Sequence, residues 1–275
     1  MPRDDIPPRS YGPLLETTLR IVTWNVWGRY GPWPQREAAI IATLQGARPD
    51  VVVLTEAWAK GDDSQCARLA GPLGLPHCAF SGVTAEEDED ALSGVAVMSR
   101  WPVRQASALT FGGARVQFAV LSGPRGPVQV YGLVMDAWWF DQSQARQGAV
   151  RELLAHAGPA QDKQAPLIVC GDFNTDPDSD EIRMLTGRTA VPVPGLSFYD
   201  AWETAGPPDP GHTWSNANPW ATQLLWPDRR IDYVFSANPR PGGAGHPVRA
   251  ALLGRQPVDG TYPSDHYALQ ADLRY

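Results

Sequence analysis

Several features that would identify a protein quickly are scarce or missing in this sequence. The 275-residue chain contains only three cysteines and two lysines, and its formal net charge is −7. No apolar run approaches the roughly 18 residues that a membrane-spanning helix needs, so we expect no stable membrane insertion. The acidic balance excludes the whole-surface basic footprint of a tight, non-specific duplex-binding protein, but a local basic patch stays open.

The cysteines give little support for a disulfide framework or a metal cluster. Cys66, Cys78 and Cys170 are odd in number and show no C-x-x-C spacing. A disulfide between Cys66 and Cys78 is one alternative. Three free thiols in a reducing cytoplasm are the better expectation, and the N-terminal segment has no apolar stretch of signal-peptide length. We therefore predict a cytoplasmic protein with three free thiols.

The chain does contain enough apolar sequence, 43%, for one sizeable core. Short apolar runs predict strands at 19–28, 51–58, 93–100, 116–123, 128–137, 166–174, 230–237 and 267–275. Helical spacing predicts helices at 35–50, 63–74 and 141–157, and a short one near 180–185. No linker divides the chain, so we predict one α/β domain over 19–275 after a Pro-rich, extended lead-in at 1–18.

Polar side chains recur at the ends of the predicted strands. They are Asn25, Glu56, Asp172, Asn174, Asp232, Asp265 and His266. An unpaired carboxylate is costly to bury, so acids at several strand ends indicate convergence on one site. Hard oxygen ligands with a single histidine suit Mg²⁺ or Mn²⁺ rather than Zn²⁺.

The run "LIVCGDFNTDP" places Asp172 and Asn174 two positions apart. Residues i and i+2 of an extended chain project to the same side, so we expect both side chains to face one phosphate. The alternative is an Asx-type turn after Gly171.

Seven motifs together resemble a known superfamily. In chain order they are "TWNVWG", "VVVLTEAW", "GVAVMSRWPV", "VCGDFNTDPDS", "DAWETAG…HTWSN", "DRRIDYVFS" and "SDHYALQADL". They resemble the endonuclease/exonuclease/phosphatase superfamily, the metal-dependent phosphohydrolases related to deoxyribonuclease I. The resemblance covers about residues 19–275. It implies an α/β fold, a four-layered sandwich of two mixed β-sheets flanked by helices, with the site at one edge.

The resemblance also implies a role for each polar residue at the metal and at the phosphate. Glu56 would be the main metal ligand, Asn25 a metal or substrate contact, and Asp265 a further member of the metal site. The implied cofactor is Mg²⁺ or Mn²⁺.

The catalytic roles follow in the same way. Asp172 would orient or deprotonate the attacking water, and Asn174 would hold the phosphate and stabilise its developing charge. Asp232 would fix one nitrogen of His266, so that the other nitrogen contacts the substrate.

The sequence departs from the family pattern in one place. Val134 stands where many relatives carry a histidine, and Tyr131 lies on the opposite face of the same predicted strand. Asp136 is either a site residue or a structural strand end, and we expect Arg146 to brace its helix. Six tryptophans lie near the expected active edge, where most are expected to pack and some to form a wall beside the substrate: Trp27, Trp33, Trp58, Trp138, Trp139 and Trp220.

The sequence therefore predicts a divalent-metal-dependent hydrolase of phosphate esters, acting by in-line water attack. A phosphodiesterase or nuclease comes first, with nucleic acid as a possible substrate. A phosphodiesterase of small-molecule or lipid head-group esters is an equal rival. A metal-binding module of the same fold with weak or lost catalysis is the alternative that Val134 motivates. We expect a monomer.

Overall fold

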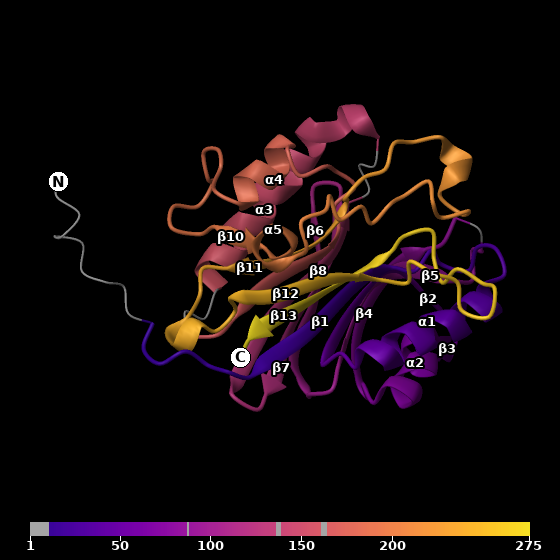
Figure 1. Cartoon of the computed structure of the whole chain (residues 1–275), viewed down its shortest axis with the longest axis horizontal. Helices are drawn as coiled ribbons and strands as arrows, with labels where there is room; N and C mark the ends of the chain where they lie inside the picture. The colour runs from indigo at the N-terminus through magenta and orange to yellow at the C-terminus, as the bar shows by residue number, and fades with distance from the viewer. Residues whose placement is uncertain (1–10, 87, 136–138, 161–163) are drawn as a thin grey trace.

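Two β-sheets packed face to face form the centre of the protein (Figure 1). The structure is a computed structural model, and it describes residues 11–86, 88–135, 139–160 and 164–275. The first sheet has seven strands in the order β12–β13–β1–β2–β5–β4, with β3 paired beside β2. The second has six strands in the order β10–β11–β9–β8–β7–β6.

The strands of the first sheet are β1 (Thr18–Asn25), β2 (Val51–Lys60), β3 (Asp63–Ser64), β4 (His77–Thr84), β5 (Leu92–Ser99), β12 (Pro247–Leu253) and β13 (Ala268–Arg274). Those of the second are β6 (Val103–Phe111), β7 (Ala114–Gly123), β8 (Gly126–Met135), β9 (Leu167–Asp172), β10 (Phe198–Asp200) and β11 (Asp232–Ala237).

Helices cover the outer faces of both sheets. The α-helices are α1 (Trp33–Ala47), α2 (Gln65–Leu73), α3 (Ser143–Ala160), α4 (Asp180–Leu185) and α5 (Ala201–Ala205), and short 3₁₀ turns occur at Phe140–Gln142, Thr222–Leu224 and Pro241–Gly243. Figure 1 shows α1 and α2 outside the first sheet and α3 and α4 outside the second. The fold is the predicted four-layered α/β sandwich. None of the described helices is long and apolar enough to cross a membrane.

The period-two alternation of the strands builds this layering. On β1, Ile21 packs between the sheets while its neighbour Val22 packs beneath α1. On β8, Val130 faces the first sheet and Tyr131 faces α3. Successive side chains of a strand point to opposite faces, so strands covered on both sides become continuous apolar runs.

Strand direction brings several strand ends to one edge of the sandwich. β1 and β2 are parallel, and so are β8 and β9. β11 runs antiparallel to β9, so Asp232 at its start lies opposite Asp172 at the end of β9. The convergence predicted from the polar strand ends follows from this arrangement.

The predicted inner strands and helices are present, and the structure adds elements that were not predicted, among them the short β3 and α5. The outermost strands β4, β6, β10 and β12 were not predicted, because an edge strand has one neighbour and a weaker apolar pattern; β6, for example, is mostly exposed or half-buried. Helix α2 runs through Pro72 and ends at Leu73, with Gly74 as its C-cap at φ 64°.

The prediction of three free thiols was wrong. Cys66 on α2 and Cys78 on β4 form a disulfide, with their Cα atoms 6.4 Å apart, and Cys170 is the buried free cysteine. The distance between the two cysteines could not be predicted from the sequence, because β4 was not predicted. The disulfide fastens an edge strand of the first sheet to the helix that covers it.

Replacing both Cys66 and Cys78 with alanine is expected to lower the free energy of unfolding by about 2–4 kcal/mol, because the crosslink restricts the unfolded chain. Urea denaturation with and without reductant measures this, and reductant should destabilise the parent but not the variant. Thiol titration of the unreduced, denatured parent should find one thiol, Cys170; three thiols would contradict the disulfide.

Candidate active site

The two sheets are joined at the converging edge by the side chain of Asn25. Its amide Nδ2 donates to Glu56 Oε1 at 2.9 Å and to Asp172 Oδ2 at 3.0 Å. Its Oδ1 accepts the backbone N–H of Trp27 at 3.0 Å, so the amide is held in one orientation. One buried amide therefore links a carboxylate of the first sheet to a carboxylate of the second.

A row of side chains crosses four strands of the second sheet at this edge. Arg115 on β7 is paired with Val134 on β8, Val134 with Asp172 on β9, and Asp172 with Asp232 on β11. Residues directly opposite one another on neighbouring strands point to the same face. Val134 packs between the sheets, so the whole row faces the first sheet, where Glu56 lies.

Asp172 and Asn174 do not have the extended geometry that the sequence predicted. β9 ends at Asp172, and Asn174 adopts φ 55°. The backbone N–H of Asn174 donates to Asp172 Oδ1 at 2.9 Å, which is the Asx-type turn named as the alternative. The Asn174 amide donates to Met135 O at 2.8 Å. Asp172 is thus fixed through both carboxylate oxygens.

Gly171 makes this strand ending possible. Its φ is 144°, and a Cβ there would lie 1.8 Å from the carbonyl oxygen of Leu133 on β8. Only glycine allows β9 to approach β8 so closely just before Asp172.

An irregularity in the pairing of β2 sets the direction in which the Glu56 side chain points. The pairing of β2 with β5 shifts register between Leu54 and Ala57, and Glu56 has φ 54°. A bulge of this kind changes which way a side chain points. Burial raises the pKa of Glu56, and the hydrogen bond from Asn25 offsets part of that effect.

Asp232 and His266 form the predicted pair. His266 Nδ1 lies 2.8 Å from Asp232 Oδ2, and both side chains are buried. Burial alone would lower the pKa of His266, but the carboxylates of Asp232, Asp265 and Asp172 outweigh it and raise this pKa well above its usual value. Trp214 is buried and packs edge-on to the imidazole at 5.1 Å between ring centroids.

Asp265 is carried by a short segment that is tied to β1. The hydroxyl of Ser264 donates to the backbone oxygen of Asn25 at 2.7 Å, and the indole of Trp24 donates to His266 O at 2.9 Å. Burial raises the pKa of Asp265 to about 6, helped by the negative charge of Glu56 and opposed by His266.

Two groups of residues could hold a cation. Asp172, Asp232 and His266 have ligand atoms within 4.8 Å of one another. His266, however, is bonded to Asp232 through Nδ1, and the surrounding carboxylates raise its pKa well above the usual value, which favours the charged form that does not ligate a metal ion. Glu56 and Asp265 are the better pair, because both are acids whose buried charges need a cation. The oxygen-rich donor set fits Mg²⁺ or Mn²⁺.

Arg115 is a site residue that the sequence did not reveal. It is half-buried, and its Nη1 donates to Ser93 O on β5 at 3.2 Å, so its side chain reaches across to the first sheet. Its positive charge lowers the pKa of Glu56. Arg115 could have been found only from its position opposite Val134 on the neighbouring strand. That position cannot be assigned before the register of the β7–β8 hairpin is known.

Other predicted residues lie around this centre. Arg146 braces α3 as expected, with Nε 2.5 Å from Glu181 Oε1 and Nη1 2.8 Å from Trp139 O. Tyr131 faces α3, away from the site, and contacts His156. Asp136 and Trp138 lie outside the described residues.

Aromatic rings border the site on two sides. Trp27 packs against Trp220 at 5.5 Å between centroids. On the other side Trp226 contacts Phe140 at 5.4 Å and Trp139 at 6.4 Å. Trp33 and Trp58 pack against each other at 5.4 Å.

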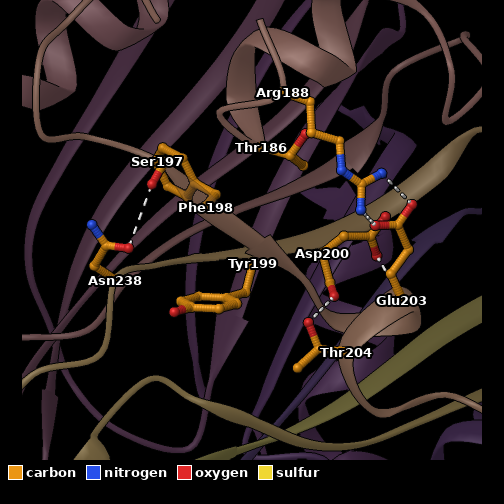
Figure 2. A pocket seen from close by; sticks show the side chains of 9 residues that line it. All are labelled: Thr186, Arg188, Ser197, Phe198, Tyr199, Asp200, Glu203, Thr204 and Asn238. Atoms are coloured by element: carbon orange, nitrogen blue, oxygen red, sulfur yellow. Dashed lines mark hydrogen bonds and ion pairs between the residues drawn. The ribbon is translucent and has the colours of Figure 1, made fainter. Parts of the chain in front are cut away.

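A separate pocket of about 350 Å³ contains none of these residues (Figure 2). It is lined by Thr186, Arg188, Ser197, Phe198, Tyr199, Asp200, Glu203, Thr204 and Asn238. Its charges are already paired, Arg188 with Glu203 at 2.6 Å and Asp200 with Arg230 at 2.5 Å. We therefore place the candidate active site at the Asn25 edge.

Comparison with known proteins shows the family to which the chain belongs. Residues 22–266 match the Endonuclease/Exonuclease/phosphatase family, and the chain belongs to that family. The Caenorhabditis elegans protein F14F9.5 is 23% identical and is matched over 97% of this chain and 95% of its own length.

Two solved structures show the same fold. An endonuclease/exonuclease/phosphatase from Beutenbergia cavernae is 26% identical, with a TM-score of 0.68 over 94% of this chain and 72% of that one. D. rerio TDP2, complexed with a single-strand DNA product, is 21% identical, with a TM-score of 0.73 over 94% of this chain and all of that one (100%). The family and fold predicted from the sequence are confirmed.

The raised pKa values predict how a metal ion changes stability with pH. Burial, then the charge of Asp232, raises the pKa of Asp172 to about 7 from its usual 3.8, and that of Asp265 is about 6. Each group stabilises the metal-free fold below its unfolded pKa, and this stabilisation is lost as pH rises through the folded value. In chelator, the melting temperature should therefore fall between about pH 4, near the unfolded pKa of both groups, and about pH 7, the higher of the two folded values.

Mg²⁺ should raise the melting temperature more at the upper end of this range than at the lower, because its ligands must be ionised. Calorimetry at both pH values checks this, and Asp172→Asn should show a shallower fall in chelator. An equal Mg²⁺ effect at both pH values would contradict a carboxylate metal site.

Proposed function

We propose that this protein is a divalent-metal-dependent phosphodiesterase that cleaves its substrate by in-line attack of water. Membership of the Endonuclease/Exonuclease/phosphatase family supports a phosphoester hydrolase. The observation that carries the proposal is the Asn25 amide, which links Glu56 and Asp172 beside the buried Asp232–His266 pair. We also propose that residues 19–275 act as one unit, in monomeric form.

Glu56 and Asp265 would hold the cation, with Asn25 orienting Glu56. When bound, the ion would neutralise negative charge on the phosphate and on the leaving oxygen. Asp172 is held by the Asn174 N–H and the Asn25 amide, so its carboxylate is positioned to take a proton from water.

His266 would act on the other side of the phosphate. Its Nδ1 is held by Asp232, which fixes the ring and keeps it charged. The second nitrogen, Nε2, would donate to a phosphate oxygen as negative charge develops. Arg115 would add a further positive charge across the row from Asp172, where Val134 offers no polar atom.

Single-stranded nucleic acid is our first choice of substrate. D. rerio TDP2 has been solved with a single-strand DNA product, and the aromatic rings beside this site could stack on unpaired bases. A lipid head-group diester is the second choice. Four apolar side chains beside Trp226 are exposed and favour it: Trp139 (50%), Phe140 (48%), Leu224 (50%) and Leu225 (89%).

Hydrolysis of bis-(p-nitrophenyl) phosphate, with p-nitrophenyl phosphate for comparison, tests the chemistry. With Mg²⁺ or Mn²⁺ the diester should be cleaved, and chelator should abolish cleavage. Asp172→Asn and His266→Ala should each lower kcat by about 10²- to 10⁴-fold. Asp178→Asn, an exposed acid in the same loop as Asp172, is the matched control and should retain activity.

Circular dichroism and melting curves would show that the variants stay folded. Full activity in folded Asp172→Asn would refute the site assignment, and absence of metal-dependent turnover in the parent would refute the function. A comparison of the rates at which the protein cleaves single-stranded DNA or RNA and the lipid head groups of vesicles then decides between the two substrates.

Arg115→Gln is expected to lower kcat/KM for the diester by about 100-fold, the effect of removing one charged donor to the phosphate. Arg115→Lys should recover part of that loss, because it restores the charge without the planar geometry. Arg104→Gln on β6 removes an exposed arginine of the same sheet and should have no effect. Equal kinetics for Arg115→Gln and Arg104→Gln would remove Arg115 from the site.

A further inference from the structure

Two cations converge on one carboxylate just beyond the candidate metal ligands. Lys60 Nζ lies 2.9 and 2.7 Å from the two oxygens of Asp88, and Arg29 Nη1 lies 3.3 Å from Asp88 Oδ2. Asp88 belongs to the turn between β4 and β5. A carboxylate held by two cations has the geometry and charge of part of a bound phosphate.

Both cations lie on the segments that build the active site. Lys60 ends β2, the strand that carries Glu56. Arg29 follows Gly28, whose N–H donates to Glu56 O at 3.1 Å, in the loop that continues from Asn25. An anion held by these cations would therefore lie at the same edge of the first sheet as the metal ligands.

Arg29 does not depend on Asp88 for its position. Its guanidinium packs over Trp33 at 4.9 Å and over Trp58 at 5.3 Å to the ring centroids. Its Nε is buried without a hydrogen-bond partner, so the pair with Asp88 leaves part of its donor capacity unused. The cation would stay in place when a different anion replaced the carboxylate.

The turn that carries Asp88 does not depend on the cations either. Backbone bonds close it, from Ala85 N to Ala91 O at 2.8 Å and from Ala91 N to Asp88 O at 2.9 Å. Asp88 and Lys60 are partly exposed, with 26% and 41% of their side chains accessible. An exposed ion pair contributes little to stability. A contribution to folding therefore does not explain why Lys60 and Arg29 both contact Asp88.

We propose that Arg29 and Lys60 form a second phosphate-binding subsite, which takes a phosphate flanking the scissile one in a single-stranded phosphodiester chain. Asp88 occupies this subsite in the free protein and competes with the substrate. The proposal rests on the proposed function for its reaction, but binding at the subsite requires no turnover.

Binding of a labelled single-stranded oligonucleotide, followed by fluorescence anisotropy with the full-length protein, tests the subsite directly. Asp88→Asn should lower the Kd and Lys60→Gln should raise it, each by about two- to fivefold, as for one exposed ion pair. Lys60→Gln should also reduce the slope of log K against log salt by about 0.7, the value for one phosphate contact to a single strand.

Asp63→Asn is the matched control. Asp63 pairs with Arg68 at 2.6 Å, and Arg68 packs over the same Trp33 and Trp58 rings. This variant also removes one negative charge from this region, but it leaves the contacts of Lys60 and Arg29 with Asp88 intact. The Kd should therefore stay unchanged. If the Kd changes equally in Asp63→Asn and Asp88→Asn, the change reflects only the lower net negative charge of the protein. That result would overturn the subsite.

Kinetics separate this proposal from the proposed function. Bis-(p-nitrophenyl) phosphate has one phosphate and cannot reach both sites, so Asp88→Asn and Lys60→Gln should not alter its kcat or KM. DNA and RNA oligonucleotides are tested separately as substrates. For each, KM should change in the same direction as the Kd, falling in Asp88→Asn and rising in Lys60→Gln. Unchanged oligonucleotide binding in both variants would refute the subsite even if the diester is cleaved, whereas absence of diester cleavage would refute the function alone.

Discussion

The candidate active site depends on the buried guanidinium of Arg36. This side chain donates to five backbone carbonyls, those of Val26, Trp27, Gly28, Tyr30 and Pro263, at 2.8–3.1 Å. Burial lowers its pKa to about 10, so it remains charged at neutral pH. One cation from α1 thereby fastens the loop after Asn25 to the segment that precedes Asp265. Without Arg36, the buried carbonyls of Val26, Gly28 and Pro263 would lose this donor at considerable cost.

The same edge concentrates negative charge that the protein only partly neutralises. Glu56, Asp172, Asp232 and Asp265 converge there. Burial raises the pKa of Glu56, Asp172 and Asp265, and the direct partner of Asp232 is His266. Such an arrangement is costly in the free protein and becomes favourable when a divalent cation and a phosphate enter. The local backbone is unusual as well, since Trp27, Glu56 and Asn174 all have positive φ. Residues in such conformations cluster at functional sites, where the surrounding structure holds them.

Much of this site could be predicted from the sequence, because its residues end the strands with the strongest apolar pattern. Asn25, Asp172 and Asp232 follow the period-two alternation and face the gap between the sheets. The backbone conformations of Glu56 and Asn174 could not be predicted, since a bulge and a left-handed residue depend on neighbouring strands. Arg115 was missed because its relation to Asp172 runs across two strand pairings rather than along the chain.

The inner strands, the main covering helices, the family and the residues that converge at one edge could all be predicted from the sequence, because alternation and turn signals are local properties of the chain. The outermost strands, the Cys66–Cys78 disulfide, the Asn25 link between the sheets and the contact of Arg29 and Lys60 with Asp88 became known only from the packed structure. Each of these joins segments that no sequence spacing connects. Edge strands have weak patterns of their own, and distances between side chains exist only once both sheets are packed.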